Sequence, residues 1–194
     1  RDKGDQRGYH RFIGEATGVG NPMTLKHFVN ISAMSYGSLS ANAVSALNQG
    51  AGEAGILHNT GEGGFAPYHQ KGGDVIFQLG TGKFGCRDDN GDFSDAAFAD
   101  IAAHANVRMI ELKLMQGAKP GKGGILPKEK ITAEIAAIRK VPMGQDVLSP
   151  PRHAEFDDLA GMFDFIARLR GMTDKPVGIK IVAGHIEEIE AIAE

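Results

Sequence analysis

Three lysines stand at or near the ends of apolar runs that resemble buried strands. Lys113 lies near the end of residues 109–114, Lys119 follows six residues later in a glycine-rich loop, and Lys180 lies within residues 176–182. A charged side chain in a buried strand needs a partner, because even an uncharged polar group left unpaired in an apolar interior costs about 2–7 kcal/mol. The lysines therefore form either structural ion pairs or part of a site for an anionic ligand or an electron-rich ring.

Polar side chains also occur at the ends of the other predicted strands, where barrel and doubly wound enzymes bind their ligands. The residues at these strand ends are Met34, Ser35, Tyr36, Gly37, Asn59, Glu62, Gln78, Lys113, Gln116, Lys119 and Lys180. Because the carboxyl ends of parallel strands share one edge of a sheet, we expect these residues to lie close together. A flavin suits the set, since a cation near its N1/O2 edge stabilises the reduced, anionic ring.

Some of these residues also have a less specific explanation. Glu62 stands between glycines and is compatible with a solvated loop carboxylate. Lys180 could extend its amine to solvent from the edge of the sheet. Gln78 lies inside an apolar strand, where a buried amide needs several hydrogen-bond partners, so a role in binding is favoured for it.

The composition excludes several classes of protein. The chain of 194 residues has a net charge of −3 and no basic run, so nucleic acid is not an expected partner. Its single cysteine, Cys86, excludes an internal disulfide, and His58, His104 and His153 lack the spacing of metal ligands. No apolar run approaches the roughly 18 residues of a membrane span, and no signal peptide is visible. We therefore expect a cytoplasmic protein without a metal site.

Strands and helices alternate along the chain, which predicts an α/β fold. The predicted strands cover residues 28–34, 55–57, 74–79, 109–114 and 176–182. The predicted helices begin at the caps Ser40, Ser94 and Thr132, cover 156–170, and begin again near 185. Short buried strands favour a parallel sheet, and neither a GxGxxG nor a GxxxxGK[ST] fingerprint is present. A (β/α)8 TIM barrel fits this pattern, although a complete one takes roughly 250 residues.

The chain divides into two parts at about residue 27. Residues 1–27 are polar, have no period and are expected to form an N-terminal arm. Residues 28–194 are expected to hold about the first five β/α units of a barrel that is truncated at its C-terminus. Five strands do not close such a barrel, so we expect its open edges to need cover, for which a homo-oligomer is one source.

Six segments resemble the FMN-binding synthase domain of glutamate synthases. They are ISAMSYGSLS (31–40), HNTGEGG (58–64), IFQLGTGKFGCR (76–87), ELKLMQGAKPGKGGILP (111–127), SPPRH (149–153) and GIKIV (178–182). VPMGQD (141–146) and GKFGCRD (82–88) look more like the stand-alone members of this family than like the large multidomain enzymes. The resemblance covers residues 28–194 and implies a (β/α)8 barrel with FMN at its C-terminal rim. It also implies an oxidoreductase that converts 2-oxoglutarate and ammonia, through 2-iminoglutarate, to glutamate with hydride from reduced FMN.

The same resemblance implies roles for individual residues. The implied cofactor-binding residues are Ala33, Met34, Ser35, Asn59, Gln78, Lys113 and Lys180. The implied substrate-binding residues are Glu62, Gln116 and Lys119. Glu62 or Lys119 would supply protons during imine formation and so act as a catalytic residue. Gln78 would hydrogen-bond the flavin ring, while Lys113 would face its N1/O2 edge.

Two positions near the oxo-acid loop depart from the multidomain enzymes. Ile125 replaces a glutamine of those enzymes, and Lys122 replaces a glutamate. The family's FMN phosphate site and iron–sulfur cysteines follow the point where this chain ends, so no iron–sulfur cluster is assignable to it. Ammonia would be free or come from another chain, and the electron donor is not predicted. The alternatives to an active enzyme are a non-catalytic flavin- or ligand-binding module and an inactive truncated fragment.

Overall fold

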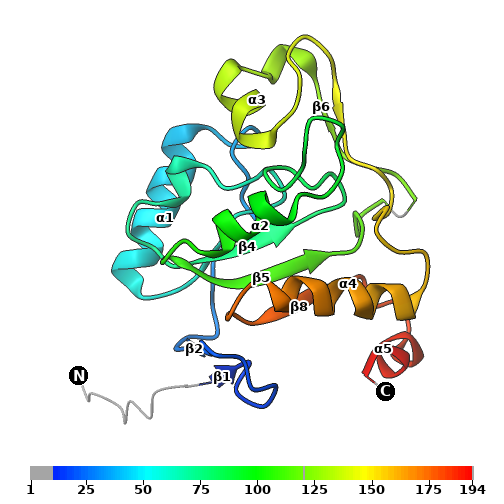
Figure 1. Cartoon of the computed structure of the whole chain (residues 1–194). Coiled ribbons are helices and arrows are strands. Elements are labelled where there is room, and N and C mark those ends of the chain that lie inside the picture. Colours follow the sequence, from blue (N-terminus) through cyan, green and yellow to red (C-terminus); the bar gives the residue numbers. More distant parts are fainter. Residues whose placement is uncertain (1–10, 120, 194) are drawn as a thin grey trace.

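The computed structural model describes residues 11–119 and 121–193, and its centre is a parallel four-stranded sheet (Figure 1). The strands β3 (His58–Asn59), β4 (Val75–Leu79), β5 (Val107–Lys113) and β8 (Val177–Lys180) lie side by side in chain order. Successive β/α units of a barrel produce this order, whereas a doubly wound sheet changes direction at a switch point. Within the described residues the sheet stays open and no closed barrel forms.

Helices connect the strands, and side-chain caps determine where most of them begin. The helices are α1 (Ala41–Ala54), α2 (Asp95–Ala102), α3 (Ala133–Arg139), α4 (Leu159–Gly171) and α5 (Ile186–Ala193), with the 3-10 turns η1 (Pro67–His69) and η2 (Lys128–Lys130). The predicted caps Ser40, Ser94 and Thr132 are confirmed, since each side chain accepts a hydrogen bond from a backbone N–H. None of the described helices is long and apolar enough to cross a membrane.

Three predicted elements differ from the structure. Residues 28–34 contribute an isolated parallel bridge from Ile31 to His58 instead of a full strand, because the first residues of this run are exposed. The strand predicted at 55–57 lies further along, as β3, because Gly55 adopts a left-handed conformation and caps the end of α1. The helix predicted from residue 156 begins as α4, after Asp158 caps its first turn.

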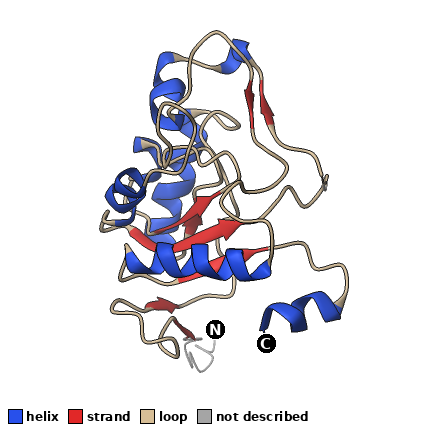
Figure 2. Ribbon diagram, turned by 45° about the vertical axis from the view of Figure 1, so that its right-hand side comes forward, coloured by secondary structure: helices blue, strands red, loops and turns tan. Residues whose placement is uncertain are grey.

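Two antiparallel strand pairs lie outside the central sheet, and the sequence pattern predicts neither. β1 (Arg11–Ile13) pairs with β2 (Met23–Leu25), so the expected irregular arm contains a hairpin, while residues 1–10 lie outside the described residues. β6 (Ile125–Leu126) pairs with β7 (Val147–Leu148). Figures 1 and 2 show the β6–β7 strand pair beside α3 above the sheet and the β1–β2 hairpin below it. Strands of two or three residues are too short for an alternating pattern to reveal.

The two faces of the sheet differ in polarity, because successive strand residues point to opposite faces. One face packs against α2 and α4 and forms the core; its cluster includes Val75, Phe77, Leu79, Phe98, Ile110, Leu112, Phe165 and Leu169. On the other face, the register sets Gln78 beside Glu111 and Lys113 beside Lys180. The alternation therefore leaves a polar face on which a site can form.

Candidate functional site

The carboxylate of Glu111 is the centre of the polar face. Its Oε1 atom accepts hydrogen bonds from Asn59 Nδ2 at 2.8 Å and from Gln78 Nε2 at 2.5 Å, so that residues of β3, β4 and β5 meet. Asn59 is 6% exposed and Gln78 only 1%. Gln78 Oε1 is buried and has no hydrogen-bond partner among the described residues. The sheet therefore presents a buried amide oxygen that accepts a hydrogen bond only when a further donor is brought to it.

A second polar cluster lies at the carboxyl end of β5. Lys113 Nζ lies 3.3 Å from Glu62 Oε2 and donates a hydrogen bond of 3.1 Å to Gln116 Oε1. Gln116 Nε2 in turn donates to Glu62 Oε1, which closes a three-membered network. The side chains of Lys113 and Glu62 are 15% and 21% exposed, so both remain accessible to a small ligand. The Lys113 ammonium is a donor, the Gln116 amide both donates and accepts, and the Glu62 carboxylate only accepts, so the cluster offers both kinds of hydrogen-bonding group to a small polar ligand.

Glycines allow the loop that carries Glu62 to lie against its neighbours. A Cβ atom at Gly80, directly after β4, would lie 2.5 Å from Glu62 Oε2. Gly61 has a φ of +65°, and a Cβ atom there would lie 2.8 Å from the backbone nitrogen of Ser35. Asn59 Oδ1 accepts a hydrogen bond from the Gly61 N–H, which ties this loop to β3. Side chains at these glycines would displace Glu62 or the neighbouring chain segment.

A small cavity of about 110 Å³ adjoins the second cluster, and Arg139 lines it together with Glu62. The remaining lining residues are Ser35, Ser38, Phe84, Gly124, Ile125, Leu126, Val147 and Ser149. Arg139 lies over the Phe84 ring at 5.1 Å, and its Nη2 donates to the carbonyl of Tyr36. Burial lowers the pKa of Arg139, and the charge of Glu62 opposes that shift. Its Nε is buried and has no hydrogen-bond partner among the described residues.

Helix α3 carries Arg139 and is attached to the loops around the site by a second residue, Glu134. The two carboxylate oxygens of Glu134 accept hydrogen bonds from Tyr36 at 2.5 Å and from Tyr68 at 2.8 Å. The hydrogen bond to Glu134 is the main cause that raises the pKa of Tyr36 to about 12, with burial as the next cause. Glu134 near the start of α3 and Arg139 at its end therefore both bond to Tyr36, and these two contacts hold Arg139 beside the cavity.

The structure brings together most, although not all, of the residues predicted for the site. Met34 donates a backbone hydrogen bond to Asn59, which places residues 33–35 alongside β3. Lys180 is half-buried and pairs in register with Lys113 on the neighbouring strand. Lys119 is exposed in the loop after β5, where its backbone N–H bonds to the carbonyl of Gln116. The predicted roles of all these residues, Ala33 included, stay predictions.

Sequence reasoning missed Glu111 and Arg139 as members of the site. Glu111 does interrupt an apolar run, and that interruption is a usable signal because a buried carboxylate requires partners. Arg139 closes α3, where a basic residue is ordinary because it interacts favourably with the helix dipole. Only the packing of α3 against the loops distinguishes Arg139 from a surface arginine.

Histidines and the cysteine do not form a metal cluster in the described part of the chain, where no group of three or more His, Cys, Asp and Glu side chains lies together. His58 is fully buried on the apolar side of β3, and burial lowers its pKa to about 4. Cys86 is also buried, which raises the pKa of its thiol and leaves it unreactive. These residues contribute to packing, not to the polar face.

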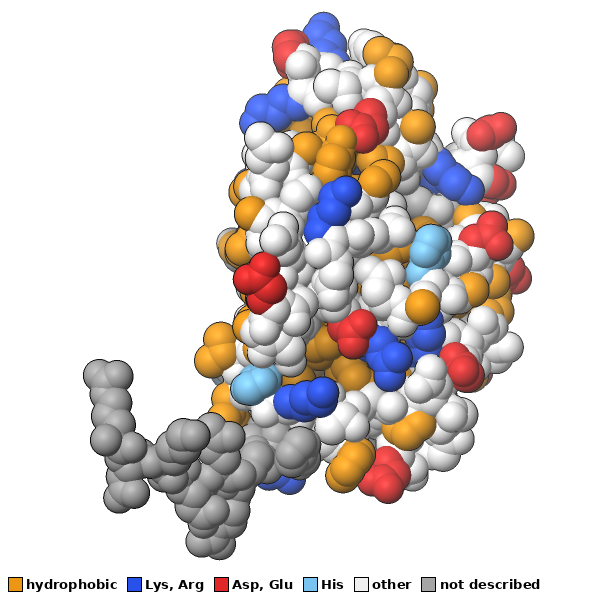
Figure 3. Space-filling view, turned by 90° about the vertical axis from the view of Figure 1, so that its left-hand side faces the viewer, with side chains coloured by type: hydrophobic (Ala, Val, Ile, Leu, Met, Phe, Trp, Pro, Cys, Tyr) orange, Lys and Arg blue, Asp and Glu red, His pale blue; other side chains and the backbone are white. Residues whose placement is uncertain are grey.

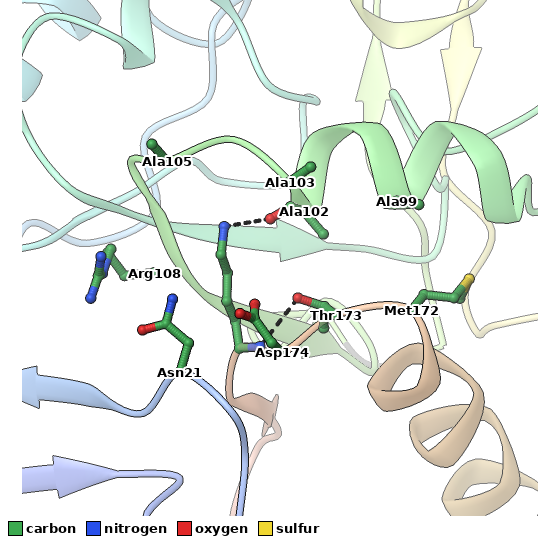
Figure 4. A pocket seen from close by; sticks show the side chains of 10 residues that line it. Asn21, Ala99, Ala102, Ala103, Ala105, Arg108, Met172, Thr173 and Asp174 are labelled. Carbon is green, nitrogen blue, oxygen red and sulfur yellow. Dashed lines mark hydrogen bonds between the residues drawn. The ribbon is translucent and has the colours of Figure 1, made fainter.

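A larger cavity of about 430 Å³ lies at the opposite end of the sheet, where β5 and β8 begin (Figure 4). Lys175 extends into this region and donates to the carbonyl oxygens of Ala102 and His104 at the end of α2. Its amine therefore satisfies carbonyl groups that the helix leaves without partners. We interpret this cavity as part of the structural end of the sheet, since its cation is already engaged.

The surface shows no concentration of one kind of charge on the face in Figure 3. Lysine and arginine side chains are scattered there among acidic, polar and hydrophobic ones. This distribution agrees with the net charge of −3.

Comparisons with known proteins identify relatives over nearly the whole chain. The family model described as the conserved region in glutamate synthase matches residues 7–194. The glutamate synthase large subunit-like protein YerD of Bacillus subtilis is 47% identical over 182 residues, which cover 93% of this chain and 34% of YerD. The archaeal glutamate synthase [NADPH] of Archaeoglobus fulgidus is 39% identical over 165 residues, covering 84% of this chain and 29% of that protein. The chain thus spans about a third of the length of these relatives.

Proposed function

Because the chain belongs to the glutamate synthase family, we propose that it forms part of an FMN-dependent oxidoreductase that converts 2-oxoglutarate and ammonia to glutamate. The observation that carries this proposal is the contact between Glu62, Lys113 and Gln116 at the carboxyl end of β5. In this proposal the open parallel sheet supplies the first strands of a (β/α)8 barrel, and its polar face lines the barrel interior.

The residues of the polar face fit an isoalloxazine ring. Gln78 Oε1 lacks a partner among the described residues, and a ring N–H is the kind of donor that would satisfy it. Lys113 brings a positive charge to the same face, as a reduced and anionic flavin requires. We assign Asn59 and the backbone of residues 33–35 to the cofactor as well, with Lys180 at the edge. FMN, when bound, supplies the hydride that reduces the imine carbon.

The second cluster and the neighbouring cavity suit the oxo acid. We assign a carboxylate of 2-oxoglutarate to Arg139, whose guanidinium lines the cavity, and the remaining polar atoms to Glu62 and Gln116. Ammonia adds to the C2 carbonyl and water leaves, so 2-iminoglutarate forms with proton transfers at nitrogen and at oxygen. In this proposal Glu62 accepts a proton from nitrogen, and Lys119 donates one to the leaving oxygen.

Partners and location complete the proposal. The electron donor is not identified, and ammonia is taken from solution or from another chain. In the part of the chain that the structure describes, β8 pairs with one strand, β5, so its other edge is available to further strands or to a second copy. We place the reaction in the cytoplasm, as the sequence led us to expect.

The test of this proposal is anaerobic reoxidation of the full natural protein. The purified protein should show a flavin absorption spectrum that bleaches on reduction and returns when 2-oxoglutarate and ammonium are added together. A protein that binds flavin but is not reoxidised would be a non-catalytic flavin-binding module. A protein without flavin would contradict both the enzyme and the flavin-binding module. Addition of 2-oxoglutarate without ammonium serves as the control.

A further inference from the structure

A buried charged network lies beside the proposed site, on residues to which the proposed chemistry assigns no role. Lys83 Nζ lies 2.7 Å from Glu155 Oε1, and His153 Nδ1 lies 3.6 Å from Glu155 Oε2. Lys83 is 5% exposed and His153 1%, while the side chain of Glu155 is 10% exposed. The three residues come from the loop after β4 and from the segment before α4, so the network joins two connections of the sheet.

The imidazole of His153 makes the link between this network and the site. Its Nε2 atom lies 2.9 Å from the backbone carbonyl oxygen of Lys113, the last residue of β5. Since a carbonyl oxygen only accepts, Nε2 carries the hydrogen and donates. The ring stacks on Phe156 at 5.3 Å, which limits its rotation. Lys113 is therefore held through its carbonyl by His153 and through its amine by Glu62.

Two neighbouring hydrogen bonds attach the same segment to the loops of the site. Thr81 Oγ1 donates to the carbonyl of Pro150 at 2.7 Å, and the backbone N–H of Ser149 donates to the carbonyl of Gly124 at 2.9 Å. Ser149 also lines the cavity that contains Arg139. The segment 149–155 thus bonds to the loop after β4 and to both ends of the glycine-rich connection that follows β5.

Stability alone does not account for this arrangement. Burial of an ion pair costs desolvation free energy that its attraction only partly offsets, so apolar residues of similar volume are often equally stabilising. An ion pair with defined hydrogen bonds does, however, specify one geometry where apolar packing would tolerate several. A role in geometry is therefore the better explanation of three ionisable side chains behind the end of β5.

We propose that His153, oriented by Glu155 and Lys83, is a positioning residue that fixes the carbonyl of Lys113 and so aims the side chains of Lys113 and Gln116 at the ligand. This inference rests on the proposed function for what those two side chains bind. Whether His153 fixes the end of β5 does not depend on which ligand binds there. The positioning role and the proposed function can therefore be tested separately.

The test compares His153→Leu with His153→Gln in the full natural protein. The glutamine amide reaches the position of Nε2 and keeps a donor for the Lys113 carbonyl, whereas leucine fills the space without one. We expect His153→Leu to lower the flavin-to-protein ratio, because Lys113 is assigned to the cofactor, and to raise the KM for 2-oxoglutarate about tenfold, because Gln116 is assigned to the oxo acid. His153→Gln should restore most of both losses. His104→Leu, which removes an imidazole before the opposite end of β5, is the control and should leave KM unchanged.

Hydrogen exchange gives a second readout that does not depend on activity. In His153→Leu the amides of residues 113–116 should exchange faster, while those within β4 keep their protection. Wild-type exchange in this variant, or failure of His153→Gln to restore slow exchange, would overturn the inference even if 2-oxoglutarate proves not to be the substrate. Should His153→Leu not fold, Glu155→Gln replaces it: faster exchange at 113–116 supports the network, and unchanged exchange refutes it.

Discussion

Glu111 accepts hydrogen bonds from two amides with one oxygen atom, and both amides are almost fully buried. The same residue breaks the apolar run of β5 in the sequence, where its charge looks like an irregularity. In the structure its carboxylate accepts hydrogen bonds from Asn59 of β3 and from Gln78 of β4. A single carboxylate therefore determines how two side chains of the proposed cofactor surface are oriented.

Substitution of Glu111 tests this role. Glu111→Ala leaves the amide donors of Asn59 and Gln78 buried without their acceptor, so we expect the free energy of unfolding to fall by about 1–3 kcal/mol and flavin content to fall with it. Urea denaturation and the flavin-to-protein absorbance ratio measure the two effects. Glu111→Gln keeps one acceptor oxygen and should lose less of both; equal losses in the two variants would contradict the hydrogen-bond explanation.

Lys119 permits a complementary experiment, because it is exposed in the loop and lies outside the polar clusters that the described residues form. We expect Lys119→Ala to retain FMN and to abolish reoxidation by 2-oxoglutarate and ammonium. Stopped-flow absorbance of the reduced protein measures the change. Lys122→Ala, three residues along the same loop, is the matched control. Loss of FMN would move Lys119 to the cofactor, and unchanged reoxidation would remove it from the mechanism.

At the scale of elements, α3 and the segment 149–155 hold the loops of the site in place. Glu134 and Arg139 join α3 to Tyr36, and His153 joins the segment 149–155 to the end of β5. The sequence predicts α3 through its cap at Thr132, but it contains no signal for what the helix contacts. Long-range hydrogen bonds of this kind depend on the packing of elements that are distant in the chain.

The segment 149–155 should make stability depend on pH in acid. Burial alone would raise the pKa of Glu155, but the nearby His153 imidazole, together with the hydrogen bond from Lys83 and its positive charge, outweighs burial and lowers this pKa to about 2. A carboxyl whose pKa is lower in the folded state stabilises the fold above its unfolded pKa and loses that contribution as the pH falls. We therefore expect stability to decrease between about pH 4.5 and 2, by about 1–3 kcal/mol from this group.

Urea denaturation of Glu155→Gln at pH 7 and pH 3 measures this contribution. The variant should be less stable than the wild type at pH 7 and should lose less stability on acidification. Asp157→Asn removes the exposed carboxylate that pairs with Arg152 and serves as the control, because surface pairs contribute little. Parallel loss in wild type and Glu155→Gln would assign the acid sensitivity to other carboxylates.

For the whole molecule, the described residues form an open parallel sheet with one polar face, and a (β/α)8 barrel stays a proposal. Strands that follow one another in the chain also neighbour one another in space, and the polar side chains of β3, β4 and β5 share one face. Exposed apolar residues on α5 and after β8, such as Val182 and Ile186, extend beyond the last strand. Both features suit a surface that further strands or another copy would cover.

Hydrogen exchange of the full natural protein tests this expectation at β8. In a parallel strand, backbone N–H groups that do not bond to one neighbour point to the opposite edge. If that edge is paired, the amides of β8 directed away from β5 should exchange as slowly as the core amides of β5. Rapid exchange of these amides would show an open edge and would count against barrel closure. The amides of β5 provide the internal reference in the same experiment.

The sequence by itself determined the alternation of strand and helix, the caps of three helices, the family and most residues at the carboxyl ends of the strands. These features depend on local periodicity, on capping chemistry and on short motifs, all of which are present within a few residues. Only the tertiary structure decided that Glu111 joins Asn59 to Gln78, that Arg139 reaches the cavity and that His153 holds the end of β5. The reason is physical: hydrogen-bond partners separated by 33 to 103 residues are chosen by how helices and loops pack on the sheet, and that packing has no local signature.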